Sequence, residues 1–493
     1  MENSIHYFTE NGIPELEKIR INFMKAPSLF DECAEEVKKI FLKIACQFLS
    51  ELLEEGNTLL EESVKRRISW QIKDRCTRNI LTPLGTVSFT HTRFKNKQTG
   101  ETAYLLDRAI GWEAHARISD GVKAALLRGA VQGSYERAGK TACEGEDCVG
   151  KETVMRCVHS TKAPSRQGGE SGSKRKVRYL YVEADEDHAA LQFHEKKGDI
   201  KRYKGHANNG EIVKLVYVHE GYKEGAGKER KRRELKNVAY FGGIYSGKRN
   251  VVLWEEVKAY IEKEYQTEEI EKIFFQSDGG GWMKKGVEKL GAELVLDEFH
   301  LSEYRIRISR LCGDTQQERE EIHQKLREWM EKGNRKQMEE WVEERKRGLG
   351  EKYQKKLEEN WNYLKNNWKG IRMRMERGDG VMGSSTEGHV SHVLSSRMSS
   401  RPMGWSHKGA DSLCRIRIYW MNGGDMLELV HSGKKAGFEE AHKEECCLSA
   451  AELLSWEKKH SQANGKYVEA LRAKVSEQTS VKVYFNTGIA GVC

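Results

Sequence analysis

Three acidic residues have sequence surroundings that suit them for chemistry. Asp185 ends the run Leu-Tyr-Val-Glu-Ala-Asp, Asp278 follows an apolar run and precedes three glycines, and Glu387 lies in Ser-Ser-Thr-Glu-Gly-His. An acid at the end of an apolar strand is costly unless it is solvated, paired or bound to a metal ion. Carboxylate oxygens are preferred ligands of Mg²⁺, and two such ions ~4 Å apart activate an attacking oxygen and stabilise a leaving one. We therefore expect the three acids to hold two Mg²⁺ or Mn²⁺ ions for phosphoryl transfer.

Each of these acids also has a plainer interpretation. Asp187 follows Asp185 by two residues, and alternate residues of a strand point to the same side, so Asp187 is an alternative first ligand. Asp278 by itself would indicate a simple Asp-Gly turn, although glycines also let the backbone turn sharply and admit a bulky partner. Ser384 and Glu387 fit the S-x-x-E pattern of a capping box, in which Glu387 would only stabilise the start of a helix.

A further acid and a histidine follow the next apolar run. In Leu-Asp-Glu-Phe-His, Asp297 and His300 stand where a strand is expected to end. Three roles fit them: metal binding, positioning of a DNA backbone, and capping of the following helix. Asp-x-x-His alone is a weak metal signal, so we treat both residues as accessory candidates.

The elements that must bring these residues together can be read between residues 177 and 300. β-branched and aromatic residues indicate strands, and apolar residues three and four apart indicate helices. The predicted strands are 177–185, 211–219, 237–245, 273–276 and 292–296, with helices at 254–265 and 282–290. Three antiparallel strands followed by two crossover-connected parallel strands match an RNase H-like order, an argument by analogy. We therefore predict an α/β fold with a mixed five-stranded sheet, whose strand ends offer ligand sites.

The rest of the chain suggests further domains around this core. Apolar spacing indicates helices, alternation indicates a hairpin, and Gly/Ser-rich composition indicates a linker. In chain order, we predict a helical module at 1–80 (helical from 15), a hairpin (87–94 and 102–106) plus a helix-turn-helix-like region within 81–160, a linker and domain boundary at 161–176, the core at 177–300, an all-helical insertion at 301–380, a helix with Glu387 at 381–412, and a C-terminal segment at 413–493.

Two segments contain basic residues that suit contact with nucleic acid. Two short helices before residue 160 are compatible with a helix-turn-helix whose second helix brings Lys151, Arg156 and His159 to a DNA groove. An ordinary helical hairpin fits the same pattern. The run at 228–233 would either track phosphates or form a solvated turn. Its DNA-binding candidates are Arg230, Lys231, Arg232 and Arg233.

The composition favours a nucleic-acid partner without requiring one. The 493 residues include 84 Lys and Arg against 75 Asp and Glu, a formal net charge of +9, and such a balance favours polyanions. No stretch approaches the ~20 apolar residues that cross a bilayer, and the first residues contain no signal-peptide core. We expect a cytoplasmic protein with no membrane partner. The 11 cysteines show no repeated C-x-x-C pair, which argues against a disulfide framework or a zinc ribbon.

In their order and spacing, these motifs resemble those of a known family. They are the segments 180–185, 277–279, 296–300 and 384–388, and Ser-Ser-Arg-Pro-Met-Gly-Trp-Ser at 399–406. Over almost its whole length, the chain resembles bacterial insertion-sequence transposases of the ISLre-two family, long known as an uncharacterised protein family and distantly similar to Mutator-type transposases. The chain departs from the family pattern at Glu186-Asp187, where a Gly and an apolar residue would be expected.

The resemblance implies a transposase of the DDE class with an RNase H-like core and a helical insertion before the final Glu. Carried over by position, the catalytic acids are Asp185, Asp278 and Glu387. Asp297 and His300 resemble an accessory motif of the Mutator-like relatives.

The resemblance also implies DNA partners. An N-terminal region would bind the terminal inverted repeats of the element, and we take Arg401 of the last motif as a further DNA contact. Water would attack in the cutting step and the new 3′-hydroxyl in the joining step, so the partners are double-stranded element ends and target DNA. Such a protein would act as a homo-oligomer on DNA in the bacterial nucleoid. Two alternatives stay open: an RNase H-fold nuclease that cuts without joining, and a transposase-derived DNA-binding protein that no longer cuts.

Overall fold

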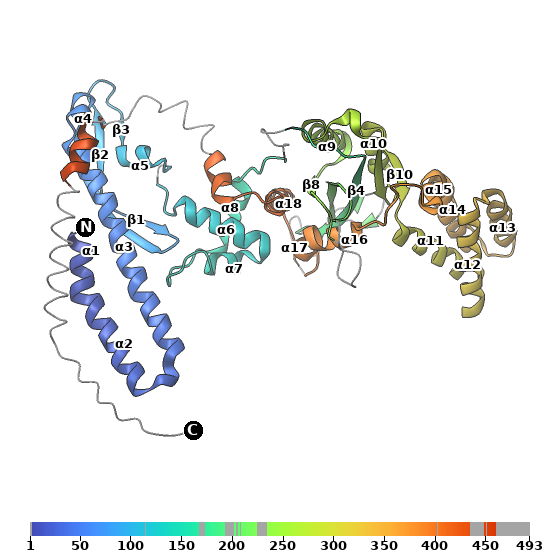
Figure 1. Cartoon of the computed structure of the whole chain (residues 1–493), viewed down its shortest axis with the longest axis horizontal. Helices are drawn as coiled ribbons and strands as arrows, with labels where there is room; N and C mark the ends of the chain where they lie inside the picture. The colour runs from blue at the N-terminus through green and yellow to red at the C-terminus, as the bar shows by residue number, and fades with distance from the viewer. Residues whose placement is uncertain are drawn as a thin grey trace. The chain divides into compact units, whose positions relative to one another are not determined.

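The chain forms two units, each with its own apolar core (Figure 1). The N-terminal unit contains residues 1–122 and 143–147 with the described residues beyond 433, and the sheet unit contains residues 123–142 and 148–433. No helix in the part of the chain that the structure describes is long and apolar enough to cross a membrane. The computed structural model describes residues 2–113, 115–166, 173–192, 202–203, 206–207, 209–223, 234–401, 403–433, 448–449 and 451–459.

The sheet unit is built on a mixed five-stranded sheet, as the sequence predicts. The strand order is β10-β9-β4-β7-β8. β7 pairs antiparallel with β4 and β8, whereas β9 pairs parallel with β4 and β10. The bounds are β4 Tyr179–Ala190, β7 Gly210–His219, β8 Ala239–Gly243, β9 Lys272–Ser277 and β10 Glu293–Leu296. A separate short ladder joins β5 (Arg202–Tyr203) and β6 (His206–Ala207).

Different elements cover the two faces of this sheet (Figure 1). Leu180 and Val182 of β4 point into a core with α9 (Asn250–Glu264) and α10 (Gly281–Leu290). Successive strand residues alternate between faces, so Glu183 points to the opposite side, where α16 (Thr386–Val390) packs on β4. Two 3-10 turns, η3 (Gly247–Arg249) and η4 (Thr267–Glu269), flank α9. The strand alternation therefore directs the odd-numbered acids of β4 toward α16.

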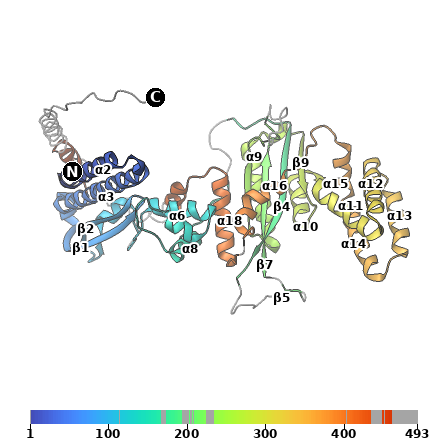
Figure 2. The same cartoon turned by 90° about the horizontal axis from the view of Figure 1, so that it is seen from below.

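Five helices follow β10 in the described stretch 298–376, where the sequence predicts an all-helical insertion (Figure 2). They pack on one another through buried Leu, Met and Trp side chains, including Leu326, Trp341 and Trp361. α15 also packs on β10, which joins the helices to the edge of the sheet. Their bounds are α11 Glu298–Cys312, α12 Gln316–Lys332, α13 Arg335–Arg347, α14 Glu351–Asn366 and α15 Trp368–Glu376.

The N-terminal unit combines a helical hairpin with a long β-hairpin, so the prediction of helix throughout 15–80 is wrong at its end. β1 (Trp70–Thr82) and β2 (Gly85–Asn96) pair antiparallel. β1 escaped prediction because most of its residues are exposed, which removes the apolar alternation that marks a strand. Its helices are α1 Glu2–Tyr7, the π-helix η1 Phe8–Gly12, α2 Ile13–Lys25, the turn η2 Pro27–Leu29, α3 Phe30–Glu62 and α4 Val64–Ser69.

The hairpin predicted from 87–94 and 102–106 is also corrected in part. β2 does pair with the second segment, but only through the two-residue strand β3 (Thr102–Ala103). The chain then turns into α5 (Leu105–Ile110), whose buried Leu105 and Leu106 join the hairpin core under α3. The main partner of β2 is β1, across a tight turn at Pro83 and Leu84.

The helices before residue 160 belong mostly to the sheet unit. They are α6 (Asp120–Gln132), α7 (Tyr135–Lys140) and α8 (Lys151–Ser160). α7 and α8 pack together, but ten residues separate them (141–150), which is longer than the ~3–4-residue turn of a helix-turn-helix. The sequence analysis expected a domain boundary at 161–176, but the two units do not divide there. α8 lies before this segment and packs against α18 (His407–Met421), which lies after it. The π-helix η5 (Ser391–Ser395) and α17 (Ser396–Met398) connect α16 to this region.

Candidate active site

Three neighbouring parallel strands, β4, β9 and β10, place Asp185, Asp278 and Asp297 at the same level of the sheet. The last paired residues of β4 and β9 are Glu183 and Gln276. Asp185 lies two residues after Glu183, and Asp278 lies two residues after Gln276, so the two acids lie side by side on neighbouring strands. The last residue of β10, Leu296, pairs with the last residue of β9, Ser277. Asp297 and Asp278 are the residues that come directly after this pair. The three carboxylates therefore form a row across the three strands.

Asp185 does not end its strand, which corrects the predicted boundary. β4 continues to Ala190 because its backbone remains paired with β7, where Leu215 lies opposite Asp185. Only the pairing with β9 stops before Asp185. The backbone of Asp185 is therefore paired with β7 on one side and unpaired on the side of β9, where Asp278 lies.

The electrostatics of Asp185 show which groups lie around it. The pKa of Asp185 is raised to about 7, chiefly by burial and to a smaller extent by the negative charges of Asp278 and Glu387. The backbone N–H of Glu186 and the charge of His300 oppose this rise. The acids that the sequence selected from three distant segments therefore share one electrostatic environment, together with His300.

The glycines after Asp278 shape its loop. The N–H of Gly280 donates to the Asp278 Oδ1 at 2.8 Å, and the hydroxyl of Tyr363 in α14 donates to the Asp278 carbonyl. Gly279 has a φ of +80°, and a Cβ at this position would lie 2.5 Å from the side chain of Asn367. Only glycine meets both conditions without strain. The tight turn therefore lets the inserted helices approach the backbone beside Asp278.

Of the three roles left open for Asp297 and His300, the structure shows capping. Asp297 is the N-cap of α11 and accepts a hydrogen bond from the backbone N–H of His300. Its carboxylate also pairs with His300 Nδ1 at 3.0 Å. Burial opposes ionisation of Asp297, but the hydrogen bonds from His300 lower its pKa, and the hydrogen bond to Asp297 raises the pKa of His300. This pair adds a positive charge next to Asp185.

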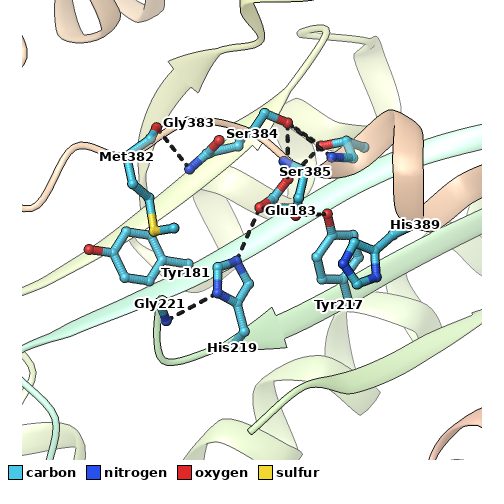
Figure 3. A network of polar contacts seen from close by, with 12 residues as sticks. Tyr181, Glu183, Tyr217, His219, Gly221, Met382, Gly383, Ser384, Ser385 and His389 are labelled. Atoms are coloured by element: carbon cyan, nitrogen blue, oxygen red, sulfur yellow. Dashed lines mark hydrogen bonds and ion pairs between the residues drawn. The ribbon is translucent and has the colours of Figure 1, made fainter. Parts of the chain in front are cut away.

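Glu183 joins the strand of Asp185 to the segment that leads to Glu387 (Figure 3). Its carboxylate accepts hydrogen bonds from the Ser385 N–H at 2.8 Å, the Thr386 hydroxyl at 2.6 Å and the hydroxyls of Ser384 and Ser385 at 3.0 Å. His219 of β7 contacts it at 3.1 Å.

The charge of Glu183 is stabilised although the side chain is fully buried. Burial alone would raise the pKa of Glu183, but His219, through a hydrogen bond and its charge, and donors from Thr386 and Ser385 lower it to about 2. The predictions from sequence assigned no role to Glu183. Its position inside an apolar strand was the available signal, because a buried charge requires partners.

Glu387 does not form the capping box that the pattern Ser384-x-x-Glu387 allowed. The N-cap of α16 is Ser385, which makes no side-chain cap hydrogen bond. Ser384 instead donates to Glu183. Glu387 is exposed in the first turn of α16, so its carboxylate remains available to the acid cluster.

Asp187, the alternative first ligand, has different surroundings. Its carboxylate accepts the hydroxyl of Ser399 at 2.8 Å and 3.0 Å, and the backbone N–H of His188 at 2.9 Å. It therefore contacts the segment after α17. Asp185 is the acid that interacts with Asp278 and Glu387.

The DNA-binding candidates fall into two groups. Lys151 and Arg156 are exposed on α8, which also contains His159. Arg401 belongs to the same unit. Lys151, His159 and Arg401 line one cavity. The basic candidates Arg230, Lys231, Arg232 and Arg233 lie outside the described residues.

The donor set suits a hard divalent cation. Asp185, Asp278 and Glu387 offer only oxygen ligands, which Mg²⁺ and Mn²⁺ prefer. Burial is the main cause of the raised pKa of Asp185, and the charges of Asp278 and Glu387, which a cation would offset, add to it. Within the described residues, however, no three His, Cys, Asp or Glu side chains are already arranged to hold an ion. A metal ion would therefore draw the three carboxylates inward.

Comparison with known proteins identifies relatives over most of the chain. The model of an uncharacterised protein family, UPF0236, matches residues 24–435. UPF0236 protein TTE2489 of Caldanaerobacter subterraneus subsp. tengcongensis is 34% identical over 405 residues, which cover 82% of this chain and 81% of that protein. A second UPF0236 protein of that organism is 32% identical over 426 residues, which cover 86% of this chain and 85% of that protein. The name of this second protein combines eleven designations, from TTE0033 to TTE2212. The chain therefore belongs to the UPF0236 family.

Proposed function

We propose that this protein is a DNA transposase of the DDE class with an RNase H-like core. The observation that carries the proposal is the electrostatic interaction of Asp185 with two acids from distant segments, Asp278 and Glu387. Asp185 and Asp278 stand level on neighbouring parallel strands, and both Asp278 and Glu387 perturb the ionisation of Asp185. Grouped acids of this kind suit metal-assisted phosphoryl transfer. The strand order and the helical insertion before Glu387 support the same assignment by analogy.

In this proposal the chain supplies ligands and their support. Asp185, Asp278 and Glu387 would hold two divalent ions, and these would supply activation of the attacking oxygen and stabilisation of the leaving one. Glu183 fixes the start of α16 against β4, so that Glu387 keeps its place relative to Asp185. His300, held by Asp297, contributes positive charge beside the reacting phosphate. Water attacks when DNA is cut, and the released 3′-hydroxyl attacks target DNA when strands are joined.

Two further observations support a mobile DNA element. A single name with eleven designations in one organism is what we expect of a gene present in many copies. A cavity of about 650 Å³ beside the loop that precedes Ser384 is lined by Arg327, Arg374 and Arg377, with Glu298 and Glu331. Arg374 and Arg377 make no ion pair with a carboxylate among the described residues. They are therefore available to phosphates.

The test is cleavage and strand transfer on a labelled duplex that carries the end of the element, with Mg²⁺ or Mn²⁺. Asp185→Asn, Asp278→Asn and Glu387→Gln should bind the duplex but neither cut nor join it. Glu186→Gln is the matched control, because Glu186 lies on the same strand but accepts a hydrogen bond from Trp282 on the opposite face.

The outcomes separate the alternatives. Retained activity in Glu387→Gln would remove Glu387 from the site. Cutting without joining would indicate a nuclease. A wild-type chain that binds element ends but never cuts, in either metal, would indicate a transposase-derived DNA-binding protein.

A further inference from the structure

A second cavity lies in the sheet unit, away from the acid cluster. It has a volume of about 630 Å³ and lies between α7, α8 and the segment from α17 to the start of α18. This volume is within the ~300–1,000 Å³ typical of pockets that enclose small ligands. Nothing in the proposed chemistry at Asp185, Asp278 and Glu387 uses it.

The walls of this cavity are aromatic and apolar. Tyr135 and Trp405 meet edge to face with ring centroids 6.3 Å apart, and Met155 and Met403 also line the cavity. The Tyr135 hydroxyl is buried and has no hydrogen-bond partner, although buried polar groups normally have one. The cavity therefore offers flat apolar contact together with an unused donor and acceptor.

A buried cation completes the lining. Arg397 is only 6% exposed, and its guanidinium lies 4.8 Å from the Trp405 ring centroid. It donates to the Ala130 carbonyl and contacts the Met403 sulfur. Among the residues that the structure describes, no carboxylate pairs with it. A buried charge without an anionic partner is costly unless a ligand supplies acceptors.

The cavity is tied to the strand of the acid cluster. The N–H of Trp405 donates to the Ala190 carbonyl at the end of β4, and the N–H of Gln192 donates to the Trp405 carbonyl. Ala190 lies five positions after Asp185, a span of ~16 Å at ~3.3 Å per strand residue. A DNA strand cut at Asp185 would therefore reach the cavity within a few nucleotides.

We propose that this cavity binds a single nucleobase that has left the DNA stack beside the cleavage site, an inference that rests on the proposed DNA chemistry. Base stacking on aromatic rings is favourable and tolerant of sequence. Arg397 and the Tyr135 hydroxyl supply hydrogen bonds to the base edge. Lys151 and Arg401 line the same cavity and suit the flanking phosphates, whereas Glu136 is neutralised by Lys140.

The acidic lining residue Glu152 suggests which bases fit best. A carboxylate accepts hydrogen bonds from the exocyclic amino groups of cytosine and adenine. A peptide segment would also bury apolar surface here, but it carries no phosphates for Lys151 and Arg401.

The test compares the affinity of the full chain for two element-end duplexes, one fully paired and one with a mismatch at a single position, moved stepwise from the cut site. Extrusion of a mismatched base avoids the cost of breaking a pair, so one or two positions should bind ~10-fold more tightly or better. Met155→Trp, which fills the cavity from an exposed position, should abolish this preference without weakening binding to the paired duplex. Met155→Leu, of similar volume, should retain it.

Cleavage of the paired duplex is measured in parallel. If wild type cuts DNA but binds mismatched and paired duplexes equally at every position, the cavity has another occupant and the inference fails alone. If Met155→Trp keeps the preference, the base binds elsewhere and the inference fails as well. If wild type binds neither duplex, the proposed function fails with it.

Discussion

Glu183 is the residue on which the geometry of the acid cluster depends most directly. It lies two residues before Asp185 on the same face of β4, and it accepts four hydrogen bonds from residues 384–386. Glu387 follows at once in the chain. A buried carboxylate with this many donors orients its neighbours strongly, because each donor would lose its partner if the segment moved. Glu183 is thus a positioning residue between two candidate ligands.

Glu183→Gln should reduce both stability and activity. Glutamine keeps the size of the side chain but presents an NH₂ group to the surrounding donors, so the free energy of unfolding should fall by ~1–3 kcal/mol. Displacement of α16 by ~1 Å should slow cleavage by ~10²-fold. Urea denaturation and single-turnover cleavage measure the two effects. Glu186→Gln is the control, and equal cleavage rates in the two variants would contradict a positioning role.

At the scale of elements, the loop between β9 and α10 links the sheet to the helical insertion. Gly279→Ala should perturb this link. Alanine at a φ of +80° is strained by ~1–2 kcal/mol, and its Cβ would also displace Asn367 at the start of α15. We therefore expect a loss of DNA cleavage greater than the loss of stability would explain.

Gly291→Ala provides the control for Gly279→Ala. Gly291 ends α10 with a φ of +61°, but an added Cβ there would meet nothing within 4 Å. The control therefore has the backbone strain without the collision. If both variants lose the same stability and the same cleavage rate, the close approach of Asn367 has no role in the site.

In the N-terminal unit, Glu61 joins α3 to the β-hairpin. Its carboxylate accepts Arg75 at 2.9 Å and 2.7 Å and contacts the Thr92 hydroxyl. The hydrogen bond from Arg75 lowers the pKa of Glu61 below its ordinary value of 4.5. A carboxyl with a lowered pKa in the folded state stabilises the protein above its unfolded pKa, and this contribution is lost as the pH falls through the folded pKa.

Glu61→Gln should therefore be less stable than wild type at about pH 7 and lose less stability between about pH 5 and about pH 3. Urea denaturation across this range measures the difference, and carboxyls shared by both proteins cancel in the comparison. Parallel stability curves for the two proteins would show that Glu61 titrates alike in the folded and unfolded chains.

The sequence predicted elements best where buried side chains follow a clear period. The strands and helices of the sheet, from 177 to 296, and the helical insertion agree with prediction because the strands are continuous buried runs and each helix buries one regular face. β1 was missed because its pairing partner, not its own apolar pattern, makes it a strand. The sequence predicted a tight turn before α8, whereas the structure has a ten-residue connection there. α8 packs against α18, whose residues are more than 240 positions away, and no local pattern could reveal that contact.

The candidate site could likewise be predicted only where it depends on local sequence patterns. The placement of Asp185 beside Asp278 followed from local patterns, since neighbouring parallel strands bring such positions to one side of the sheet, although β4 continues beyond Asp185. The contacts of Glu183 with residues 384–386 and the cavity around Arg397 required knowledge of which distant segments pack together. No spacing in the chain encodes those contacts.

At the scale of the whole molecule, both units belong to the family. The match over residues 24–435 covers most of the N-terminal unit and the whole of the sheet unit. The relatives share this length, with 81% and 85% of their own chains covered. Under the proposed function, recognition of element ends and cutting would then be properties of one chain with two units.

Binding of a divalent ion should be visible in the stability of the whole chain. Without metal, burial disfavours the charge of Asp185 most, and the charges of Asp278 and Glu387 repel it as well, so the pKa of Asp185 is raised. A ligand that binds only the folded state stabilises it by ~2.7 kcal/mol at a concentration of 100 times its Kd. Mg²⁺ should therefore raise the Tm of wild type at constant ionic strength.

Asp278→Asn should reverse this pattern. Removal of one charge relieves the repulsion, so the variant should melt at or above the Tm of metal-free wild type, yet Mg²⁺ should shift it little because a ligand is lost. Asp185→Asn should behave in the same way, whereas Asp187→Asn should keep the wild-type shift. Scanning calorimetry with and without Mg²⁺ measures all four proteins. A Mg²⁺ shift that survives in Asp185→Asn but disappears in Asp187→Asn would transfer the first ligand to Asp187, and an equal shift in every protein would mean that the ion binds outside the acid cluster.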